Sequence, residues 1–395
     1  MPHKHSLVSI SISALTCAAL IAGLAYGLWL LSNNEPARDT YTINEALDGQ
    51  NTSGFFQATR PRQFAFPTDH GPHEGYRTEW WYFTGNVITS EGRPFGFELT
   101  FFRVALTPTK TVDDSAWRTN QLYMAHFALT DVDGKQFYAF ERFSRSALGL
   151  AGAQAQPVHI WLEDWFVRSS ETQGFPVNLS AADGDVAIEL RLDQGKPVVL
   201  HGQRGFSQKN AKPGNASYYY SLTRMPTRGR VRIGSETFEV VGASWMDREW
   251  STSALGADQI GWDWFALQLS DGHEIMFYRL RRNDGSTDPY SAGTLVTPSG
   301  TALHLTHDAV QIKILDYWQS PRDGIRYPAR WRFTIPIEKL ELEIRPVLAE
   351  QELNLSVRYW EGAVEFGGTH GDDPIHGRGY VELTGYSRRQ GPRNQ

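Results

Sequence analysis

A hairpin pattern that occurs twice in the chain constrains its fold more than any other feature. Residues 80–87 (WWYFTGNV) are similar to residues 262–269 (WDWFALQL), and each segment is followed by a turn that contains glycine. The segments that come next, 98–103 (ELTFFR) and 274–279 (EIMFYR), also match, so the shared pattern is W-x-[YW]-F, turn, E-[LI]-x-F-[FY]-R. The copies lie about 180 residues apart, which indicates two related β domains rather than a short-period solenoid.

Strand signals are frequent after residue 60, whereas sustained helical periodicity is nearly absent. Short runs rich in β-branched and aromatic residues, bounded by turn-forming residues, predict strands. These runs are residues 95–104, 123–130, 186–192, 230–241, 262–269, 274–280 and 380–386. Aromatic residues make up 13% of the chain, and 36 Gly and 20 Pro supply turns, a composition typical of an all-β protein. We therefore predict two consecutive antiparallel β-barrels of about eight to ten strands, closed so that no sheet edge is exposed.

The N-terminal segment has a different character. Residues 7–31 form a run of 25 without charge, which is long enough to span a bilayer. A cleavage site at residues 25–27 (AYG) is poor, because apolar residues continue past it. We predict an uncleaved membrane anchor, with a cleaved signal peptide as the first alternative and a buried core helix as the last. Lys4 precedes the segment, and the positive-inside rule then places the body outside the cytoplasm, in the periplasm.

The predicted organisation has five parts. They are a signal or anchor segment (1–32), a polar linker (33–60), an N-terminal lipocalin-like barrel domain (61–250), a C-terminal lipocalin-like barrel domain (251–388) and a tail (389–395).

Charge, cysteine usage and absent motifs exclude several functions. The formal net charge of -6 argues against nucleic acid as a partner. The only cysteine, Cys17, lies in the apolar segment, so the body has no disulfide, zinc-thiolate site or cysteine nucleophile. The sequence also lacks Gly-x-Ser-x-Gly, His-Glu-x-x-His, a P-loop and a dinucleotide-binding glycine motif. We therefore expect no cofactor.

The densest group of polar and aromatic residues is the segment 242–251 (GASWMDREWS). In an extended strand, Trp245, Asp247 and Glu249 share one face, and the two carboxylates lie about 6–7 Å apart along the strand. In a dry cavity beside a tryptophan, Asp247 could have a raised pKa and act as a general acid, while Glu249 orients water. The alternative is a structural network in which Arg248 neutralises a carboxylate at the domain junction.

Two more segments are candidate ligand-binding sites. Glu79 precedes three aromatic residues, and Glu79, Trp80 and Tyr82 could lie at a barrel mouth. The alternative is that one of these tryptophans plugs the end of a barrel core. Tyr218 and Tyr220 share a face of a predicted strand, where their rings could stabilise a cation. The alternative there is the ordinary preference of β-sheets for tyrosine.

Histidine spacing predicts no metal site. His304 and His307 have His-x-x-His spacing, but no predicted helix aligns their rings. Residues 370–376 (HGDDPIH) form a polar loop that could bind a cation. His201 is isolated in the sequence. We therefore expect no bound metal.

Several motifs occur together in the order found in a known family. They are residues 79–86 (EWWYFTGN), 205–209 (GFSQK), 217–221 (SYYYS), 244–250 (SWMDREW), 359–362 (YWEG) and 379–386 (GYVELTGY). The set resembles the AttH-like, lipocalin-like proteins, relatives of carotenoid 1,2-hydratase that are often labelled secreted hydrolases. The resemblance covers residues from about 60 to 388 and implies two consecutive calycin-type β-barrels.

The resemblance also implies a chemistry. The hydratase relatives add water to an isolated carbon–carbon double bond by acid–base chemistry without a cofactor, and fungal relatives act as pericyclases. The acid of the hydratases lies in a Tyr-x-Asp motif that matches residues 245–247, where Asp247 is kept and Trp245 replaces the tyrosine. A His-x-Trp element matches residues 218–220, where neither residue is kept.

These observations lead to one main expectation. The chain is expected to be an exported or membrane-anchored protein that binds a hydrophobic, unsaturated small molecule or lipid. As a hydratase, isomerase or cyclase it would use Asp247 as proton donor, and Glu249 would orient water or tune Asp247. The side chains of Trp245, Tyr218 and Tyr220 would stabilise positive charge, and Trp264 is a further expected ligand-binding residue. One alternative is a non-catalytic binding module of the cell envelope that serves a transporter. Another is a scaffold whose barrels are filled by their own aromatic residues.

Overall fold

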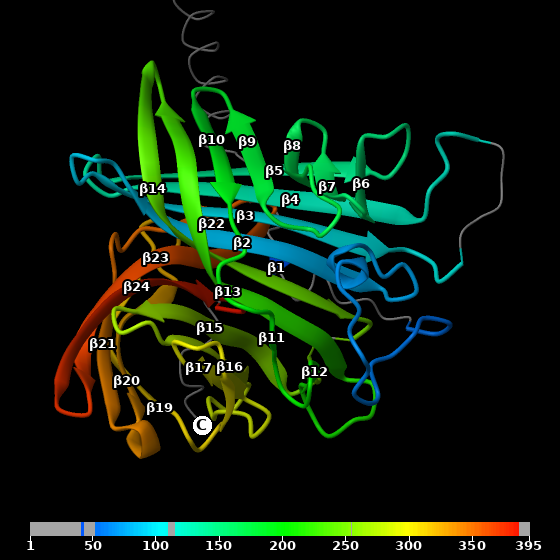
Figure 1. The fold of residues 1–395 in the computed structure, drawn as a ribbon. Coiled ribbons are helices and arrows are strands. Elements are labelled where there is room, and N and C mark those ends of the chain that lie inside the picture. Colours follow the sequence, from blue (N-terminus) through cyan, green and yellow to red (C-terminus); the bar gives the residue numbers. More distant parts are fainter. Residues whose placement is uncertain (1–40, 43–51, 110–114, 254, 387–395) are drawn as a thin grey trace, which may run out of the picture. The chain divides into compact units, whose positions relative to one another are not determined.

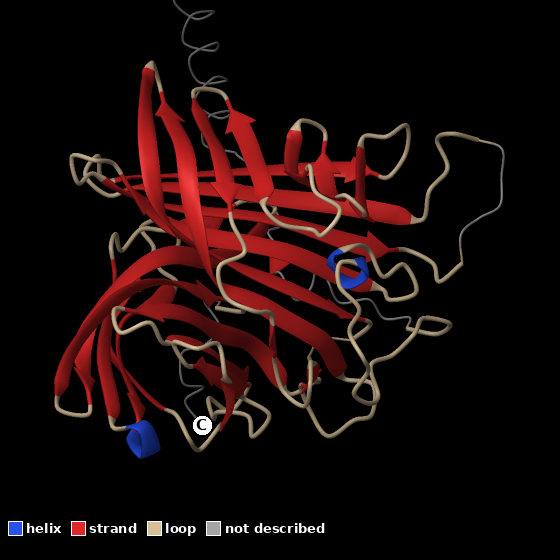
Figure 2. Ribbon diagram, viewed as in Figure 1, coloured by secondary structure: helices blue, strands red, loops and turns tan. Residues whose placement is uncertain are grey.

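The structure is a computed structural model that describes residues 41–42, 52–109, 115–253 and 255–386. The predicted anchor, most of the predicted linker and the predicted tail lie outside the described residues. Two short 3-10 helices, η1 (Thr68–His70) and η2 (Pro336–Glu338), interrupt an otherwise all-β arrangement (Figure 2). A search of the described residues for a helix long and apolar enough to cross a membrane finds none.

A thirteen-stranded sheet, called the first sheet here, is formed by residues of the N-terminal half (Figure 1). Its strands are β2 (Thr78–Ile88), β3 (Pro94–Ala105), β4 (Gln121–Asp131), β5 (Gln136–Arg145), β6 (Ala151–Ala155), β7 (Val158–Leu162), β8 (Trp165–Ser169), β9 (Val177–Asp183), β10 (Val186–Leu192), β11 (Val199–Leu200), β12 (Phe206–Gln208), β13 (Ala216–Ile233) and β14 (Glu236–Ser251). Their order is β5-β4-β3-β2-β14-β13-β10-β9-β8-β7-β6, and β11 and β12 both pair with β13.

An eleven-stranded second sheet is formed mainly by the C-terminal half. Its strands are β1 (Tyr41–Thr42), β15 (Gln259–Leu269), β16 (Glu274–Arg282), β17 (Ala292–Val296), β18 (Ala302–Thr306), β19 (Gln311–Gln319), β20 (Arg326–Ile335), β21 (Leu340–Pro346), β22 (Glu352–Asn354), β23 (Val357–His370) and β24 (Asp373–Leu383). Their order is β18-β17-β16-β15-β24-β23-β21-β20-β19, with β22 antiparallel and β1 parallel to β23.

The predicted all-β, lipocalin-like fold class is confirmed, with one difference in detail. Within the described residues, no strand pairing joins β5 to β6 or β18 to β19, which end the two paths. The sheets are therefore not closed by hydrogen bonds, although full closure was expected.

The hairpin repeat seen in the sequence occupies equivalent places in the two sheets. The order β4-β3-β2-β14-β13 in the first sheet corresponds to β17-β16-β15-β24-β23 in the second. In the first sheet Trp80 pairs with Phe102, and the counterpart of Phe102 in the repeat is Tyr278. In the second sheet, however, Trp262 pairs with Leu280, which lies two residues beyond Tyr278. A shift of two residues keeps every side chain on its original face. The repeat therefore preserves which residues point inward and which point outward.

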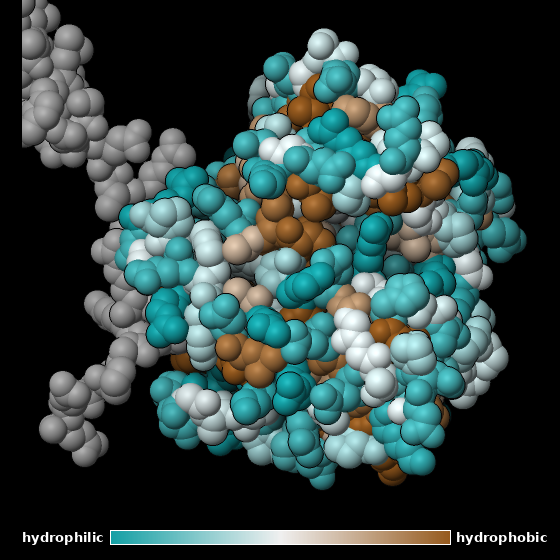
Figure 3. Space-filling model, turned by 90° about the vertical axis from the view of Figure 1, so that its left-hand side faces the viewer, coloured by the Kyte–Doolittle hydropathy of each residue, from teal (hydrophilic) through white to brown (hydrophobic). Residues whose placement is uncertain are grey.

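The central strands of each sheet are buried on both faces. Along β2, Trp81 and Phe83 pack into the core of the first sheet, while Trp80 and Tyr82 face the second sheet. This alternation follows from the two-residue period of a strand. The inner face of the second sheet has its own apolar core, which includes Trp331. On the face shown in Figure 3, hydrophobic residues form separate patches among hydrophilic ones.

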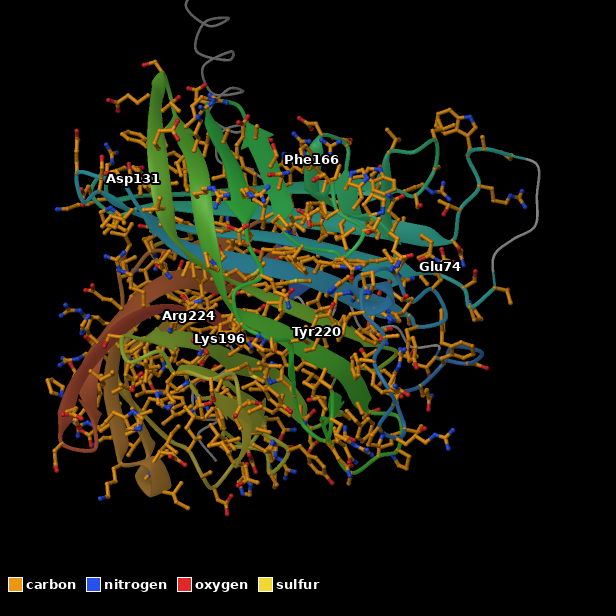
Figure 4. The ribbon with its side chains drawn as sticks, in the orientation of Figure 1. Glu74, Asp131, Phe166, Lys196, Tyr220 and Arg224 are labelled. Atoms are coloured by element: carbon orange, nitrogen blue, oxygen red, sulfur yellow. The ribbon has the colours of Figure 1, made fainter. Side chains whose placement is uncertain are left out.

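A buried ion pair holds the two sheets together. Glu274 on β16 is fully buried and binds Lys196 Nζ at 2.8 Å and Arg224 Nε at 2.5 Å. Both cations belong to the N-terminal half, and Figure 4 labels them near the boundary between the two sheets. Thr223 Oγ1 donates a third hydrogen bond to Glu274, at 3.2 Å.

We expect Glu274→Gln to destabilise the protein, because it leaves two cations without their buried partner. Loss of hydrogen bonds to a charged group predicts a fall in the free energy of unfolding of about 1.5–3 kcal/mol. Urea denaturation of the purified variant measures it. Glu239→Gln, which breaks an exposed pair with Arg230, is the matched control and should leave the midpoint unchanged. Equal effects of the two variants would show that the Glu274 cluster does not hold the sheets.

Candidate functional site

The main candidate site is a cavity between the outer faces of the two sheets. The cavity has a volume of about 70 Å³, which is enough for a few water molecules or a narrow, flat group. Aromatic rings and carboxyl groups from both sheets line it. The lining residues are Trp80, Tyr82, Thr100, Phe102, Lys209, Tyr219, Asp247, Glu249, Leu255, Trp262, Trp264, Tyr278, Leu280, Tyr359 and Glu382.

Asp247 lies at the centre of the wall that the first sheet contributes. Strand β14 runs between β13 and β2, so Asp247 is paired with Ser221 on one side and Tyr82 on the other. The Asp247 carboxylate accepts hydrogen bonds from the hydroxyls of Ser221 and Tyr219. It also accepts one from Trp245 Nε1 at 2.6 Å. Only 4% of Asp247 is exposed, so the group is presented to the cavity rather than to bulk solvent.

The protonation of Asp247 is finely balanced. Burial raises the pKa of its carboxyl to about 7, although the hydrogen bonds from Ser221, Tyr219 and Trp245 favour the ionised form. The negative charge of nearby Glu249 adds to the rise. Asp247 can therefore both give and take a proton near neutral pH.

A chain of hydrogen bonds leads from Asp247 away from the cavity. His201 Nε2 lies 2.6 Å from Ser221 Oγ, and His201 Nδ1 lies 2.8 Å from Thr294 Oγ1. Burial lowers the pKa of His201 to about 3, so its ring is neutral at pH 7. One tautomer of the His201 ring satisfies every contact. In this tautomer the Thr294 hydroxyl donates to His201 Nδ1, and His201 Nε2–H donates to Ser221 Oγ. The Ser221 hydroxyl in turn donates to the Asp247 carboxylate. Thr294 is paired with His304, an exposed residue on β18, so the chain approaches solvent.

Glu249 is held by a buried cation. Lys209 Nζ lies 3.2 Å from Glu249 Oε1 and 4.0 Å from the centre of the Tyr278 ring. Burial alone would lower the pKa of Lys209, but the charge of Glu249 outweighs it and the pKa is raised. Lys209 therefore stays charged and holds the Glu249 side chain in place beside Asp247.

The second sheet contributes further carboxyl groups to the site. Burial raises the pKa of Glu382 to about 7, and Trp262 Nε1 donates to this carboxyl at 2.8 Å. Behind it, Tyr82 OH donates to Glu361 Oε1 at 2.6 Å. Burial raises the pKa of Glu361 well above its usual range and that of Glu98 to about 8. Among the described residues, no hydrogen-bond partner is found for Glu98 Oε2 or Glu361 Oε2.

The structure brings most of the predicted site residues together. Asp247, Glu249, Trp80, Tyr82 and Trp264 line the cavity. Trp245 lies beside them, with its ring 6.3 Å from that of Trp264 and its indole nitrogen bound to Asp247. The cavity lies between the sheets rather than inside a barrel, because the inner faces are filled by their own apolar side chains.

Glu79 was predicted to bind the ligand, but it does not line the cavity. As the neighbour of Trp80 it points to the opposite face of β2, where it is fully buried. It forms ion pairs with Arg103 and Arg248 there. Burial would raise its pKa, but the charges of the two arginines outweigh burial and hold the pKa well below the usual range. Glu79 is therefore a structural ion-pair residue.

The predicted pair Tyr218 and Tyr220 is also outside the cavity. Both side chains pack with Trp250 on the other face of β13, and Figure 4 labels Tyr220 on this strand. Tyr220 OH lies 2.7 Å from His70 Nδ1. The intervening Tyr219 faces the cavity instead, because side chains alternate along the strand.

Four ionisable residues of the site were missed in the sequence. They are Lys209, Glu98 and Glu361, which are buried, and Glu382, which is partly buried. Three of them fall within the family motifs and Glu98 begins the second half of the hairpin repeat, so a signal existed. His201, in contrast, carries no sequence signal, because its partners lie on distant strands.

The raised pKa values predict how stability depends on pH. Asp247, Glu382 and Glu98 retain protons in the folded state up to about pH 7–8, whereas unfolded carboxyls ionise near pH 4. Unfolding therefore releases protons. Above about pH 7 most unfolded-state histidines are also neutral, so buried neutral histidines such as His201 oppose this effect little. We expect the free energy of unfolding to fall between about pH 6.5 and 8.5.

Urea denaturation across this pH range measures the slope. Glu382→Gln removes one titrating group and should flatten the slope, whereas Glu343→Gln, in an exposed pair with Arg330, should leave it unchanged. A slope that is the same in wild type and Glu382→Gln would contradict the assignment.

Comparison with known proteins identifies the family. A model of the AttH-like family matches residues 57–386. The crystal structure of an AttH protein from Nitrosomonas europaea has 33% identity and a TM-score of 0.75, covering 84% of this chain and all of that one. Kievitone hydratase from Nectria haematococca has 15% identity and a TM-score of 0.64, covering 85% of this chain and 97% of its own. CghA with Sch210972 has 13% identity and a TM-score of 0.53, covering 88% and 98%.

The similarities to kievitone hydratase and to CghA, at 15% and 13% identity, show a shared fold alone. The comparison with curated proteins found no significant match. The family match spans both sheets and the whole cavity, and the chain belongs to the AttH-like family.

Proposed function

We propose that this protein is a cofactor-free acid–base enzyme that acts on a hydrophobic, unsaturated small molecule in the cavity between the sheets. The observation that carries the proposal is the Asp247 carboxyl, which is buried in the cavity wall and whose pKa is raised to about 7. A carboxyl that remains partly protonated at neutral pH is what protonation of an alkene requires.

The reaction begins with transfer of the Asp247 proton to one carbon of a double bond. The π electrons form the new C–H bond, so the other carbon becomes a cation and Asp247 becomes a carboxylate. Addition of water followed by loss of a proton gives a hydratase, and loss of a proton from a neighbouring carbon gives an isomerase. Attack by a second double bond of the same molecule forms a carbon–carbon bond and moves the cation, and loss of a proton from a carbon next to the new cation completes a cyclase reaction. Each outcome returns one proton to the enzyme.

The surroundings of Asp247 suit a positive intermediate. The rings of Trp80, Trp264 and Tyr219 line the same cavity, and aromatic faces attract a cation. Glu249, paired with Lys209, provides the carboxylate that orients water. Glu382 lies on the wall from the second sheet and can accept the departing proton.

The hydrogen-bonded chain behind Asp247 gives a route for its proton. Thr294, His201 and Ser221 can all pass a proton in the same direction, toward the carboxylate. Because His201 is neutral, it relays a proton by exchanging its tautomer rather than by holding a charge. We assign these residues the task of restoring the acid after each turnover.

The family supports a small-molecule role without fixing the substrate. Kievitone hydratase is named for a hydration and shares the fold, so the fold can hold such a reaction. Export or anchoring through residues 7–31 remains part of the proposal, as does an extracytoplasmic location. The competing function, a non-catalytic binding module for a lipid or small molecule, is an outcome of the experiment below.

We expect Asp247→Asn to abolish turnover and to retain binding, because the amide keeps the shape of the side chain but cannot donate an acidic proton. The ligand is first identified by mass spectrometry of protein purified gently from its native host. It is then incubated with the protein in deuterated water. Wild type should incorporate solvent deuterium into carbon, and a hydratase should also add the mass of one water.

The matched control is Asp164→Asn, which changes a carboxyl exposed on the surface. It should behave as wild type, and tryptophan fluorescence should show ligand binding in all three proteins. Wild-type deuterium incorporation by Asp247→Asn would end the proposal. Binding without incorporation by any protein would favour the non-catalytic module.

We expect Ser221→Ala to slow turnover by about 10- to 100-fold, because it cuts the link between His201 and Asp247. It also removes a hydrogen bond that favours the ionised carboxylate, so the pKa of Asp247 should rise further. The alkaline limb of the pH–rate profile should then move to higher pH. Ser217→Ala, on the same strand, is the control and should leave both quantities unchanged. An unchanged profile in Ser221→Ala would contradict the relay.

A further inference from the structure

Two neighbouring turns of the second sheet bring two histidines and an aspartate together, away from the residues that line the cavity. Asp271 and His273 lie in the turn between β15 and β16, and His370 ends β23. The turns are adjacent because β15 pairs with β24, the strand that follows β23. Ser270 N donates to His376 O at 2.8 Å, which ties the β15–β16 turn to the start of β24.

The three side chains converge on a single point. His370 Nδ1 lies 2.8 Å and His273 Nδ1 lies 3.0 Å from the same oxygen, Asp271 Oδ2. One ligand atom from each of the three residues lies within 4.8 Å of the others. The other oxygen, Asp271 Oδ1, accepts from the backbone N–H of His273 at 3.0 Å, and this fixes the carboxylate. The arrangement is therefore held by the backbone of the turn.

One nitrogen in this cluster, His273 Nδ1, lies where a metal ligand would lie and forms no hydrogen bond with the described residues. His273 Nδ1 is shielded from solvent, and no hydrogen-bond partner for it is found in the described residues. It is close to Asp271 Oδ2, but the angle does not suit an N–H donor. A shielded imidazole nitrogen without a hydrogen bond is unfavourable by itself and becomes favourable when the nitrogen binds a cation.

We propose that Asp271, His273 and His370 form a binding site for a divalent transition-metal ion of the zinc type. Around a tetrahedral zinc ion with bonds of about 2.0–2.1 Å, neighbouring ligand atoms lie roughly 3.3–3.4 Å apart. The distances from Asp271 Oδ2 to His370 Nδ1 and to His273 Nδ1 reach this value if the side chains move apart by a few tenths of an ångström. Water supplies the fourth ligand, because the side chains are partly exposed to solvent.

The ligand set selects the class of ion. Two imidazole nitrogens and one carboxylate suit Zn²⁺, Ni²⁺ or Cu²⁺. Ca²⁺ and Mg²⁺ prefer sites made only of oxygen ligands. The bound ion would join the β15–β16 and β23–β24 hairpins, which both contribute residues to the cavity. The site is independent of the proposed reaction, since it shares no residue with the cavity wall.

Histidine 376 provides a matched control. His376 lies on β24 near this turn and is exposed, but it does not belong to the three-residue cluster. The sequence suggested that the loop 370–376 could bind a cation by itself. The structure instead joins His370 to Asp271 and His273 from another hairpin.

The test is isothermal titration of Zn²⁺ into the full chain, without a histidine tag and after treatment with a chelator. We expect wild type and His376→Ala to bind one more ion per chain than His273→Ala and His370→Ala. In His273→Ala and His370→Ala, loss of this site should appear as a rise of more than about 10-fold in the Kd for Zn²⁺. Circular dichroism checks that each variant is folded, and two independent variants guard against a local effect of either substitution.

A second measurement uses Co²⁺ as a spectroscopic probe. Wild type should give the visible absorption of tetrahedral Co²⁺, and His370→Ala should not. Saturable binding that is equal in wild type and both cluster variants would overturn the proposal. Absence of saturable binding in wild type would also overturn it, and would show that Asp271 only forms ion pairs with the two histidines.

Discussion

The structure depends on the burial of both faces of its central strands. Strand β2 places alternate side chains into an inner core and onto a second interface, and β14 and β15 do the same. A strand of an antiparallel sheet commonly has one dry and one wet face. Here the outer faces are dry because the two sheets pack against each other. The cavity is the part of this contact that side chains do not fill.

This double burial separates two kinds of carboxyl group. Glu79 and Glu274 are fully buried, and each is neutralised by two cations, so they hold the fold together. Asp247 is also buried and Glu382 is partly buried, but aromatic and hydroxyl donors surround their carboxyls instead of cations. An unpaired buried carboxyl lowers its energy by keeping its proton. Exclusion of water therefore makes Glu79 and Glu274 structural, whereas it makes Asp247 and Glu382 suitable for proton transfer.

The sequence predicted the fold class and the repeat well, because both depend on local strand patterns and turns. It also placed Trp245, Asp247 and Glu249 on one face, since that follows from the period of a strand. It did not reveal which face meets the second sheet, so Tyr218 and Tyr220 were chosen in place of Tyr219. The relay through His201 joins residues from three strands of two sheets, and this contact depends on tertiary packing. The domain boundary near residue 250 stays a prediction.

The repeat has an evolutionary consequence. Of the two halves with the same strand order, one supplies Asp247 and the other supplies facing aromatic rings and Glu382. Neither half lines the cavity alone. A substitution on one outer face therefore changes the environment of the other. If the cavity holds the proposed substrate, its preference would shift through paired substitutions on the two facing sheets rather than through single ones.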